Sequence, residues 1–310
     1  MHYIRPRRSI VRRLPTKTAS GVSSAVVERG EIVIVVTGVA GRLGDRVARL
    51  LIERGYDIVG TDQITPEGFP SDFVLEDLRD REAVDRLLDG ADAVVHMGAH
   101  PGPARMEPRA IFANNVDSTF NLMMSAAEKG LRRVVFSSSA FAMGWAHEGE
   151  AFVPRYLPLD EDHPMMPFEP YGLSKQVGED IAQMISRNSA TSVVSLRFTN
   201  VVYPEDQSEF PWPAPTPEEP LTLVMWAYAD PRDVAEAHVL ALEADIISHE
   251  AFLIAQNSNR LKVPTRELIK QNFGEQVEIR GPLEGNASVI STEKAQRMLG
   301  WKPRYDWTRD

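Results

Sequence analysis

A strand signal that runs directly into a glycine-rich turn constrains the fold more than any other feature of this chain. Residues 32–36 are Ile-Val-Ile-Val-Val, a β-branched run typical of a parallel strand buried on both faces. The run continues into Thr37-Gly-Val-Ala-Gly-Arg-Leu-Gly44, and a segment with helical periodicity follows as far as Gly55. Strand, turn and helix in this order predict the first unit of a parallel sheet covered by helices.

The three glycines of this turn predict a phosphate-binding loop. Gly38 lets the chain turn sharply, Gly41 lets the backbone approach a pyrophosphate, and Gly44 lets the helix pack closely on the sheet. The phosphates would lie at the positive end of the helix, where Arg42 and Leu43 begin it. The spacing is G-x-x-G-x-x-G and differs from the G-x-G-x-x-G of the dinucleotide fingerprint, so the flanking strand and helix supply the context.

The second strand, residues 57–62, ends in Asp62, eighteen residues after Gly44. A carboxylate at this place can accept both hydroxyls of an adenosine ribose and would repel a 2′-phosphate. No Lys or Arg stands at residues 63–65. The sequence therefore predicts NAD in preference to NADP, with a turn residue or helix cap as the alternative role for Asp62.

Strands and helices alternate along the following hundred residues. Apolar strands are expected at 73–75, 93–97 and 133–136, and a long helix at about 109–128. This alternation predicts an α/β fold with a doubly wound parallel (Rossmann) sheet. His96 ends one of the strands, and we expect it to be a packed strand residue with no part in chemistry.

A tyrosine and a lysine four residues apart open a later helix. Tyr171 and Lys175 share one face of that helix. An ammonium beside a phenol favours the phenolate and lowers the pKa of the phenol, which could then exchange a hydroxyl proton near neutral pH. Ser139, at the end of a neighbouring strand, could hydrogen-bond the same substrate oxygen. The alternatives are a half-buried helix tyrosine and a serine that caps a strand end.

Several short segments carry a family resemblance, and they are Thr37–Gly44, Asp62, Asp77-Leu78, His96–Ala99, Asn115–Asn121, Phe136–Ala140, Tyr171–Lys175, Leu196–Asn200, Arg232–Ala237 and Leu299–Pro303. With them the chain resembles the extended short-chain dehydrogenase/reductases, in the NAD-dependent epimerase/dehydratase branch, over about residues 32–303. The resemblance implies that Tyr171 is the acid/base. It also implies that Lys175 binds the nicotinamide ribose and that Ser139 orients the reacting oxygen.

The same resemblance implies roles for residues around that centre. Asp77 and Leu78 would contact adenine. Asn115 would support the site from its helix, or be a buried asparagine satisfied by backbone groups. Asn200 would lie between nicotinamide and substrate, or be a turn residue. The implied cofactor contacts also include Gly98 and Ala99, and the expected substrate side includes His100 and Phe141.

Two departures from the family bear on the reaction. The residues after Ser139 are Ala-Phe-Ala, so the acid pair that dehydratases carry there is missing and dehydration is disfavoured. About 33 residues separate Asn200 from Asp233, and the segment 204–220 among them holds six prolines, five carboxylates and no Lys or Arg. Such a segment is a poor cradle for a diphosphate, unless it lies outside the site.

We therefore predict an NAD-dependent oxidoreductase that transfers hydride between NAD and a small alcohol or carbonyl compound, sugar-derived by analogy with the compact uronate-dehydrogenase-like members. An aromatic and methionine-rich lining within 141–168 also suits a less polar substrate. The runner-up is a nucleotide-sugar 4-epimerase that retains NAD. A third hypothesis, a non-catalytic NAD-binding regulatory protein, is disfavoured because such proteins tend to lose the Tyr–Lys pair.

Composition excludes several other classes. The net charge of −10 disfavours nucleic-acid binding, and the lack of cysteine excludes a disulfide framework and a thiol nucleophile. We expect no metal, because no His/carboxylate cluster has ligand spacing, and no membrane span, because no apolar run is long enough. Residues 1–30 hold seven basic side chains and one acid, which leaves sixteen net negative charges on the rest. The expected location is cytoplasmic, with organelle import through this basic head as the alternative.

The expected organisation has three parts. Residues 1–30 form a disordered basic extension, 31–200 an NAD-binding Rossmann domain, and 201–310 a small C-terminal substrate-binding lobe. Within the last part, 221–245 and parts of 250–256 are expected to return to the sheet. We also expect a homodimer through the helices that carry Asn115 and Tyr171, although packing within one chain would explain their apolar positions equally well. Those positions are Phe112, Phe120, Leu122, Met123, Met124, Val177, Ile181 and Met184.

Overall fold

The computed structural model describes residues 32–102, 106–144, 153–203, 205 and 225–307, all within one structural unit that spans residues 31–310. The basic head and most of the acidic segment 204–220 lie outside the described residues.

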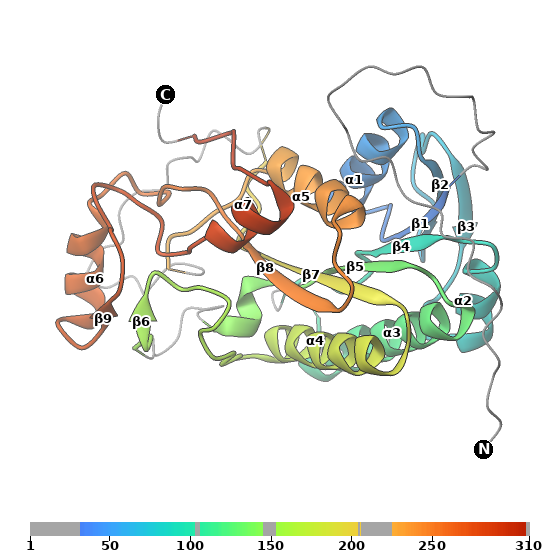
Figure 1. Cartoon of the computed structure of the whole chain (residues 1–310), viewed down its shortest axis with the longest axis horizontal. Helices are drawn as coiled ribbons and strands as arrows, with labels where there is room; N and C mark the ends of the chain where they lie inside the picture. The colour runs from blue at the N-terminus through green and yellow to red at the C-terminus, as the bar shows by residue number, and fades with distance from the viewer. Residues whose placement is uncertain (1–31, 103–105, 145–152, 204, 206–224, 308–310) are drawn as a thin grey trace. The chain divides into compact units, whose positions relative to one another are not determined.

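A seven-stranded sheet forms the centre of this unit (Figure 1). Its strand order is β3-β2-β1-β4-β5-β7-β8, and every neighbouring pair is parallel. The order reverses between β1 and β4, which is where doubly wound sheets hold their ligands. The prediction of a doubly wound parallel sheet is confirmed. The strands are β1 (Val33–Thr37), β2 (Asp57–Asp62), β3 (Asp72–Leu75), β4 (Ala93–His96), β5 (Arg133–Ser137), β7 (Ser192–Phe198) and β8 (His249–Ile254).

Helices cover both faces of the sheet (Figure 1). One face carries α1, α5 and α7, and the other carries α2, α3 and α4. The helices are α1 (Arg42–Glu53), α2 (Arg81–Leu87), α3 (Pro108–Lys129), α4 (Pro170–Asn188), α5 (Pro231–Glu243), α6 (Thr265–Phe273) and α7 (Glu293–Leu299), with a short 3-10 helix η1 (Ala140–Met143).

The alternation of side chains along β1 shows why this run of residues needs cover on both sides. Ile34 and Val36 enter the core beneath α1 and α5, whereas Val35 enters the core beneath α2, α3 and α4. All three side chains are almost completely buried. Successive residues of a strand point to opposite faces, so a strand that is apolar throughout is stable only between two layers of helices.

A smaller lobe lies beyond the carboxyl ends of the strands. It contains a two-stranded parallel sheet of β6 (Tyr156–Leu157) and β9 (Glu278–Ile279), together with α6. A third apolar core fills it, and this core includes Leu253 of β8 and both Ala140 and Met143 of η1. The lobe therefore packs directly against the last strand of the large sheet and against the short helix that follows β5.

No helix in the described ranges is long and apolar enough to cross a membrane.

Candidate active site

A cleft of about 580 Å³ opens where the strand order of the sheet reverses. The glycine turn after β1 forms one wall, the ends of β2 and β4 form the floor, and the start of α4 closes the far side. Its lining includes predicted cofactor residues from both the turn and the helix, namely Gly38, Gly41, Arg42, Leu43, Gly44, Asp62, Leu78, Gly98, Ala99, Tyr171 and Lys175.

The glycine turn is held against β4 and α1 at distances that exclude side chains. Gly38 has a φ of +78°, and a Cβ there would lie 2.8 Å from the backbone nitrogen of Gly98. A Cβ at Gly44 would lie 2.0 Å from the carbonyl oxygen of Gly38. The backbone nitrogens of Gly38 and Val39 donate to the Thr61 carbonyl, and that of Gly41 donates to the Gly38 carbonyl, so these bonds hold the turn in shape. A pyrophosphate would therefore bind at the positive end of α1, which begins at Arg42.

Asp62 lines the cleft and also holds the turn. Its Oδ2 accepts a hydrogen bond from the backbone nitrogen of Ala40 at 3.0 Å, and its Oδ1 accepts from Gln63 and Ile64 at 2.7 and 3.2 Å. The turn role that we weighed as an alternative is present, and the carboxylate still reaches the cleft where a ribose would lie.

Asp77 and Leu78 are adjacent in the sequence, but their side chains have different surroundings. Leu78 lines the cleft, but Asp77 is not among its lining residues. Arg79 forms hydrogen bonds and an ion pair with Asp77 at 2.5–3.1 Å, which hold the pKa of that carboxyl below its usual range. The preceding residue, Glu76, lines the cleft instead. The side chains placed to contact adenine are therefore those of Leu78 and Glu76, and not that of Asp77.

Tyr171 and Lys175 line the α4 end of the cleft, and Ser139 lies beside Tyr171 but is not among the lining residues. The Nζ of Lys175 donates a 2.8 Å hydrogen bond to the carbonyl oxygen of Ser137 and lies 5.5 Å from the centre of the Tyr171 ring. Ser139 Oγ accepts from the backbone nitrogen of Phe141 at 3.1 Å, and the Ser139 side chain lies close enough to Tyr171 to lower the pKa of the phenol. Phe141 packs edge-on against the Tyr171 ring, with the centroids 5.9 Å apart.

Burial controls the protonation of this pair in the structure. Removal from water raises the pKa of Tyr171 to about 12, although the Ser139 hydrogen bond works in the opposite direction. Removal from water lowers the pKa of Lys175 to about 7. The expected lowering of the phenol pKa by Lys175 is therefore absent here. The physical reason is that desolvation is the largest effect on the phenol, while the amine binds the Ser137 carbonyl.

Asn115 joins the loop after β4 to the helix that carries Tyr171. Its Oδ1 accepts from the backbone nitrogen of His100 at 2.8 Å, and its Nδ2 donates to the His100 carbonyl at 3.1 Å. The same Nδ2 donates to Ser174 Oγ at 3.3 Å, on α4. The side chain is buried and satisfied partly by backbone groups. In this arrangement Asn115 positions His100, which lines the cleft.

The other predicted residues lie around the cleft with different surroundings. His96 is buried between the hydroxyls of Thr37 and Thr119, and burial lowers its pKa to about 3, so it is a neutral packed residue. Asn200 is half-buried, and its carbonyl accepts from the backbone nitrogen of Ala229 at 2.9 Å. Besides Asp77, four predicted site residues are not among those that line the cleft, namely Asn115, Ser139, Phe141 and Asn200.

Sequence reasoning missed the residues that fix the start of α4. Glu169 caps the helix, accepting from the backbone nitrogens of Tyr171 and Gly172 at 2.6 and 2.5 Å. A Cβ at Gly172 would lie 2.4 Å from the carbonyl oxygen of Phe141, so only glycine lets α4 approach η1 this closely. The pattern Glu169-Pro170 was the available signal, because proline favours the first position of a helix.

Comparison with known proteins agrees with this geometry. Residues 34–216 match the model of the NAD dependent epimerase/dehydratase family. UDP-glucose 4-epimerase of Streptococcus mutans is 25% identical over 88% of this chain and 92% of its own. UDP-arabinose 4-epimerase 1 of Arabidopsis thaliana is 29% identical over 62% of this chain and 48% of its own. The chain spans about half the length of several curated relatives that it matches.

A solved structure extends the likeness to the fold. A short-chain dehydrogenase/reductase superfamily protein from Agrobacterium tumefaciens with bound NAD superposes with a TM-score of 0.70. It is 26% identical and the match covers 89% of this chain and 94% of that one. With the family match over more than half of its residues, the chain belongs to the NAD-dependent epimerase/dehydratase family, a branch of the extended short-chain dehydrogenase/reductase enzymes.

Proposed function

We propose that this protein transfers a hydride between NAD and a carbinol carbon of a small, sugar-derived substrate, with Tyr171 as the acid/base. The observation that carries the proposal is the position of Tyr171 and Lys175, with Ser139 beside Tyr171, at one end of a cleft whose other end is the glycine turn before α1. A backbone segment suited to phosphate and a group suited to proton transfer thus line the same cleft.

The residues of the cleft fit NAD. The N–H groups at the start of α1 would hold the pyrophosphate, in a cradle that a Cβ at Gly38 or Gly44 would fill. Asp62 would accept the hydroxyls of the adenosine ribose, and Lys175 those of the nicotinamide ribose. When bound, the oxidised nicotinamide supplies a hydride acceptor and a positive charge that favours the Tyr171 phenolate.

The chain's own residues would then accept the hydroxyl proton of the substrate. Ser139 would hold the substrate hydroxyl oxygen, and the Tyr171 phenolate would accept the hydroxyl proton as the carbon–hydrogen bond gives up its hydride. The products are a carbonyl compound, NADH and a neutral Tyr171. Because burial raises the pKa of Tyr171, the positive charge of the oxidised cofactor must lower it before the phenol can exchange a proton near neutral pH.

The charges around the cleft favour a substrate without a diphosphate. Among the described residues that line it, Arg42 and Lys175 are the only Lys or Arg side chains. Arg42 pairs with Glu205 at 2.5 Å and stacks on Tyr203, while Lys175 belongs to the proton-transfer group. No described Lys or Arg in the lining therefore remains to hold a diphosphate beside Tyr171.

Epimerisation at C4 of a nucleotide sugar is the second candidate, because relatives across most of the chain carry that name. The same Tyr171 would serve an oxidation followed by re-reduction, and NAD would stay bound. An anaerobic screen of sugars, sugar acids and UDP-sugars separates the two. NADH that accumulates in proportion to substrate supports the dehydrogenase, and UDP-sugar interconversion with co-purified NAD and no net NADH supports the epimerase.

Tyr171→Phe tests the catalytic assignment in either reaction. We expect turnover to fall by about 10²–10⁴-fold, with an unchanged melting temperature. Tyr56→Phe is the matched control, because the Tyr56 hydroxyl bonds Glu243 at 3.0 Å, away from the cleft, and its loss should leave turnover unchanged. A Tyr171→Phe enzyme within a few-fold of wild type would overturn the proposal.

We also propose a homodimer through α3 and α4. Leu122, Met123 and Ile181 pack into the chain's own core, so they are not available to a partner. Phe120 on α3 and Leu173 on α4 remain 44% and 42% exposed. Phe120→Glu should convert a dimer to a monomer in light scattering, and a wild-type monomer would contradict the proposal.

A further inference from the structure

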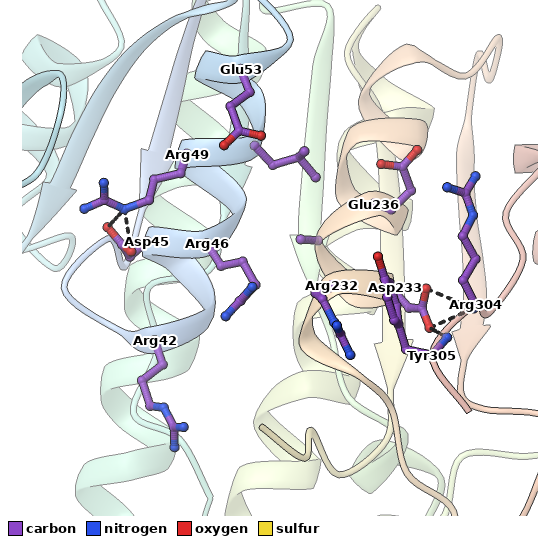
Figure 2. A pocket seen from close by; sticks show the side chains of 12 residues that line it. Arg42, Asp45, Arg46, Arg49, Glu53, Arg232, Asp233, Glu236, Arg304 and Tyr305 are labelled. Atoms are coloured by element: carbon purple, nitrogen blue, oxygen red, sulfur yellow. Dashed lines mark hydrogen bonds and ion pairs between the residues drawn. The ribbon is translucent and has the colours of Figure 1, made fainter. Parts of the chain in front are cut away.

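A second cavity, of about 420 Å³, lies between α1 and α5 (Figure 2). Five of its lining residues are arginines, which is unexpected in a chain with a net charge of −10. They come from three separate segments: Arg42, Arg46 and Arg49 from α1, Arg232 from the start of α5, and Arg304 from the segment after α7.

Two of the arginines face each other across the cavity. Figure 2 shows Arg46 extending from α1 toward the gap that separates it from α5, and Arg232 at the start of α5 on the other side of this gap, while Arg42 extends past the start of α1. Arg49 points to the other side of α1, where it pairs with Asp45 at 2.8 Å. Glu53 lies toward the opposite end of the gap.

The acids of the lining are engaged with other groups. Asp233 accepts from the backbone nitrogens of Arg304 and Tyr305 at 3.0–3.1 Å and from Gln256 Nε2 at 2.6 Å. Glu236 pairs with Arg54 at 2.5 Å. Neither carboxylate forms an ion pair with Arg46.

One donor of Arg46 lacks a partner. Its Nε is shielded from water and has no hydrogen-bond partner in the described part of the chain. A buried donor without a partner costs free energy, so such a group indicates a ligand that completes it. The neighbouring arginines are held in place: Arg232 pairs with Asp230 at 2.8 Å and stacks on Tyr305 at 3.5 Å.

We propose that this cavity binds the phosphate group of a small phosphate monoester through Arg46, with Arg232 facing it from α5. A planar guanidinium offers paired N–H donors that match phosphate oxygens, and arginines fixed by stacking are already oriented. Leu50 and Ala235 line the cavity between the two helices and provide apolar walls for the organic part. The cavity volume lies within the range of small-molecule sites.

This proposal does not depend on the reaction proposed above, because Arg46, the residue that carries it, does not line the NAD cleft. Arg42 lines both cavities. Binding should therefore be measured with saturating NAD present, so that a phosphate probe cannot enter the glycine turn.

Isothermal titration with ribose 5-phosphate, inorganic phosphate and ribose tests the site. We expect one ribose 5-phosphate per chain, weaker binding of inorganic phosphate, and no binding of ribose. Affinity should fall as ionic strength rises. Equal affinity for inorganic phosphate would overturn the monoester assignment, and the lack of saturable binding of either probe would overturn the site.

Arg46→Gln locates the site within the molecule. It should weaken ribose 5-phosphate binding by at least about tenfold, since a hydrogen-bonded charge is lost. Arg81→Gln, an equal charge change at an exposed residue of α2, should leave binding unchanged. If Arg46→Gln fails to fold, Arg232→Gln is the second variant to test. It should also weaken ribose 5-phosphate binding. Equal effects of the Arg46 and Arg81 substitutions would refute the proposal.

Discussion

A buried ion pair beside Ser139, the proposed catalytic serine, offers the sharpest test of how this site is held together. Glu179 on α4 accepts hydrogen bonds from Arg197 Nε at 2.9 Å and Nη2 at 2.8 Å, and from Ser138 Oγ at 2.6 Å. The Glu179 side chain is completely buried and that of Arg197 is 7% exposed. The pair connects the helix of Tyr171 to β7 and to the residue next to Ser139.

Glu179→Gln should be strongly destabilising. Glutamine keeps the size of the side chain but leaves the Arg197 charge buried without a counter-charge. Loss of one partner of a buried pair costs about 3–5 kcal/mol. For a chain of this length that corresponds to a fall in melting temperature of roughly 5–8 °C.

Equilibrium urea unfolding and thermal melting would measure this effect against two controls. Glu128→Gln removes an exposed partner of Arg81, 3.4 Å away, and should cost less than about 1 kcal/mol. The double substitution Glu179→Leu with Arg197→Met removes both charges and should regain most of the lost stability. The reasoning is refuted if Glu179→Gln costs no more than Glu128→Gln, or if the double variant is no more stable than Glu179→Gln.

Three further outcomes follow from the cleft. Fluorescence titration should show tighter binding of NAD than of NADP, and Asp62→Asn should narrow the difference by about tenfold, since a charge that repels the 2′-phosphate is removed. A wild-type preference for NADP would contradict the role of Asp62. Gly44→Ala should lower the free energy of unfolding by about 3 kcal/mol and weaken NAD binding, because the Cβ of the alanine would meet the Gly38 carbonyl. An unchanged melting temperature would contradict this prediction. Burial lowers the pKa of Lys175 to about 7, so the unfolded chain binds more protons above that pH, and stability should rise between about pH 7 and 10. This rise in stability, measured without added NAD, should be absent from the Lys175→Met variant. An identical pH dependence of stability in the two proteins would contradict the role of Lys175.

The sequence predicts well those parts of the fold that depend on short-range pattern. The β-branched run of β1 and the glycines after it lie within a dozen residues of each other, so their spacing specifies strand, turn and helix together. The same holds for Tyr171 and Lys175, which share a face because they are one helical turn apart.

Features that depend on distant backbone or on burial could not be predicted in this way. Lys175 binds the carbonyl of Ser137, and a backbone acceptor leaves no residue-type signal. The pKa of Tyr171 is set by exclusion of water, which depends on the packing of the whole site. The pairing of Tyr156 with Glu278 joins strands of two residues each, too short to show periodicity.

The shared core of the small lobe bears on how this enzyme could be re-engineered. Leu253 of β8 and Ala140 of η1 belong to the same apolar cluster, and Ala140 follows Ser139 directly. Grafting a relative's lobe onto this sheet would therefore displace Ser139, the proposed catalytic serine, unless η1 were exchanged with the lobe. Chimeras that move η1 and the lobe together should retain turnover, whereas those cut between them should fold with a misplaced Ser139.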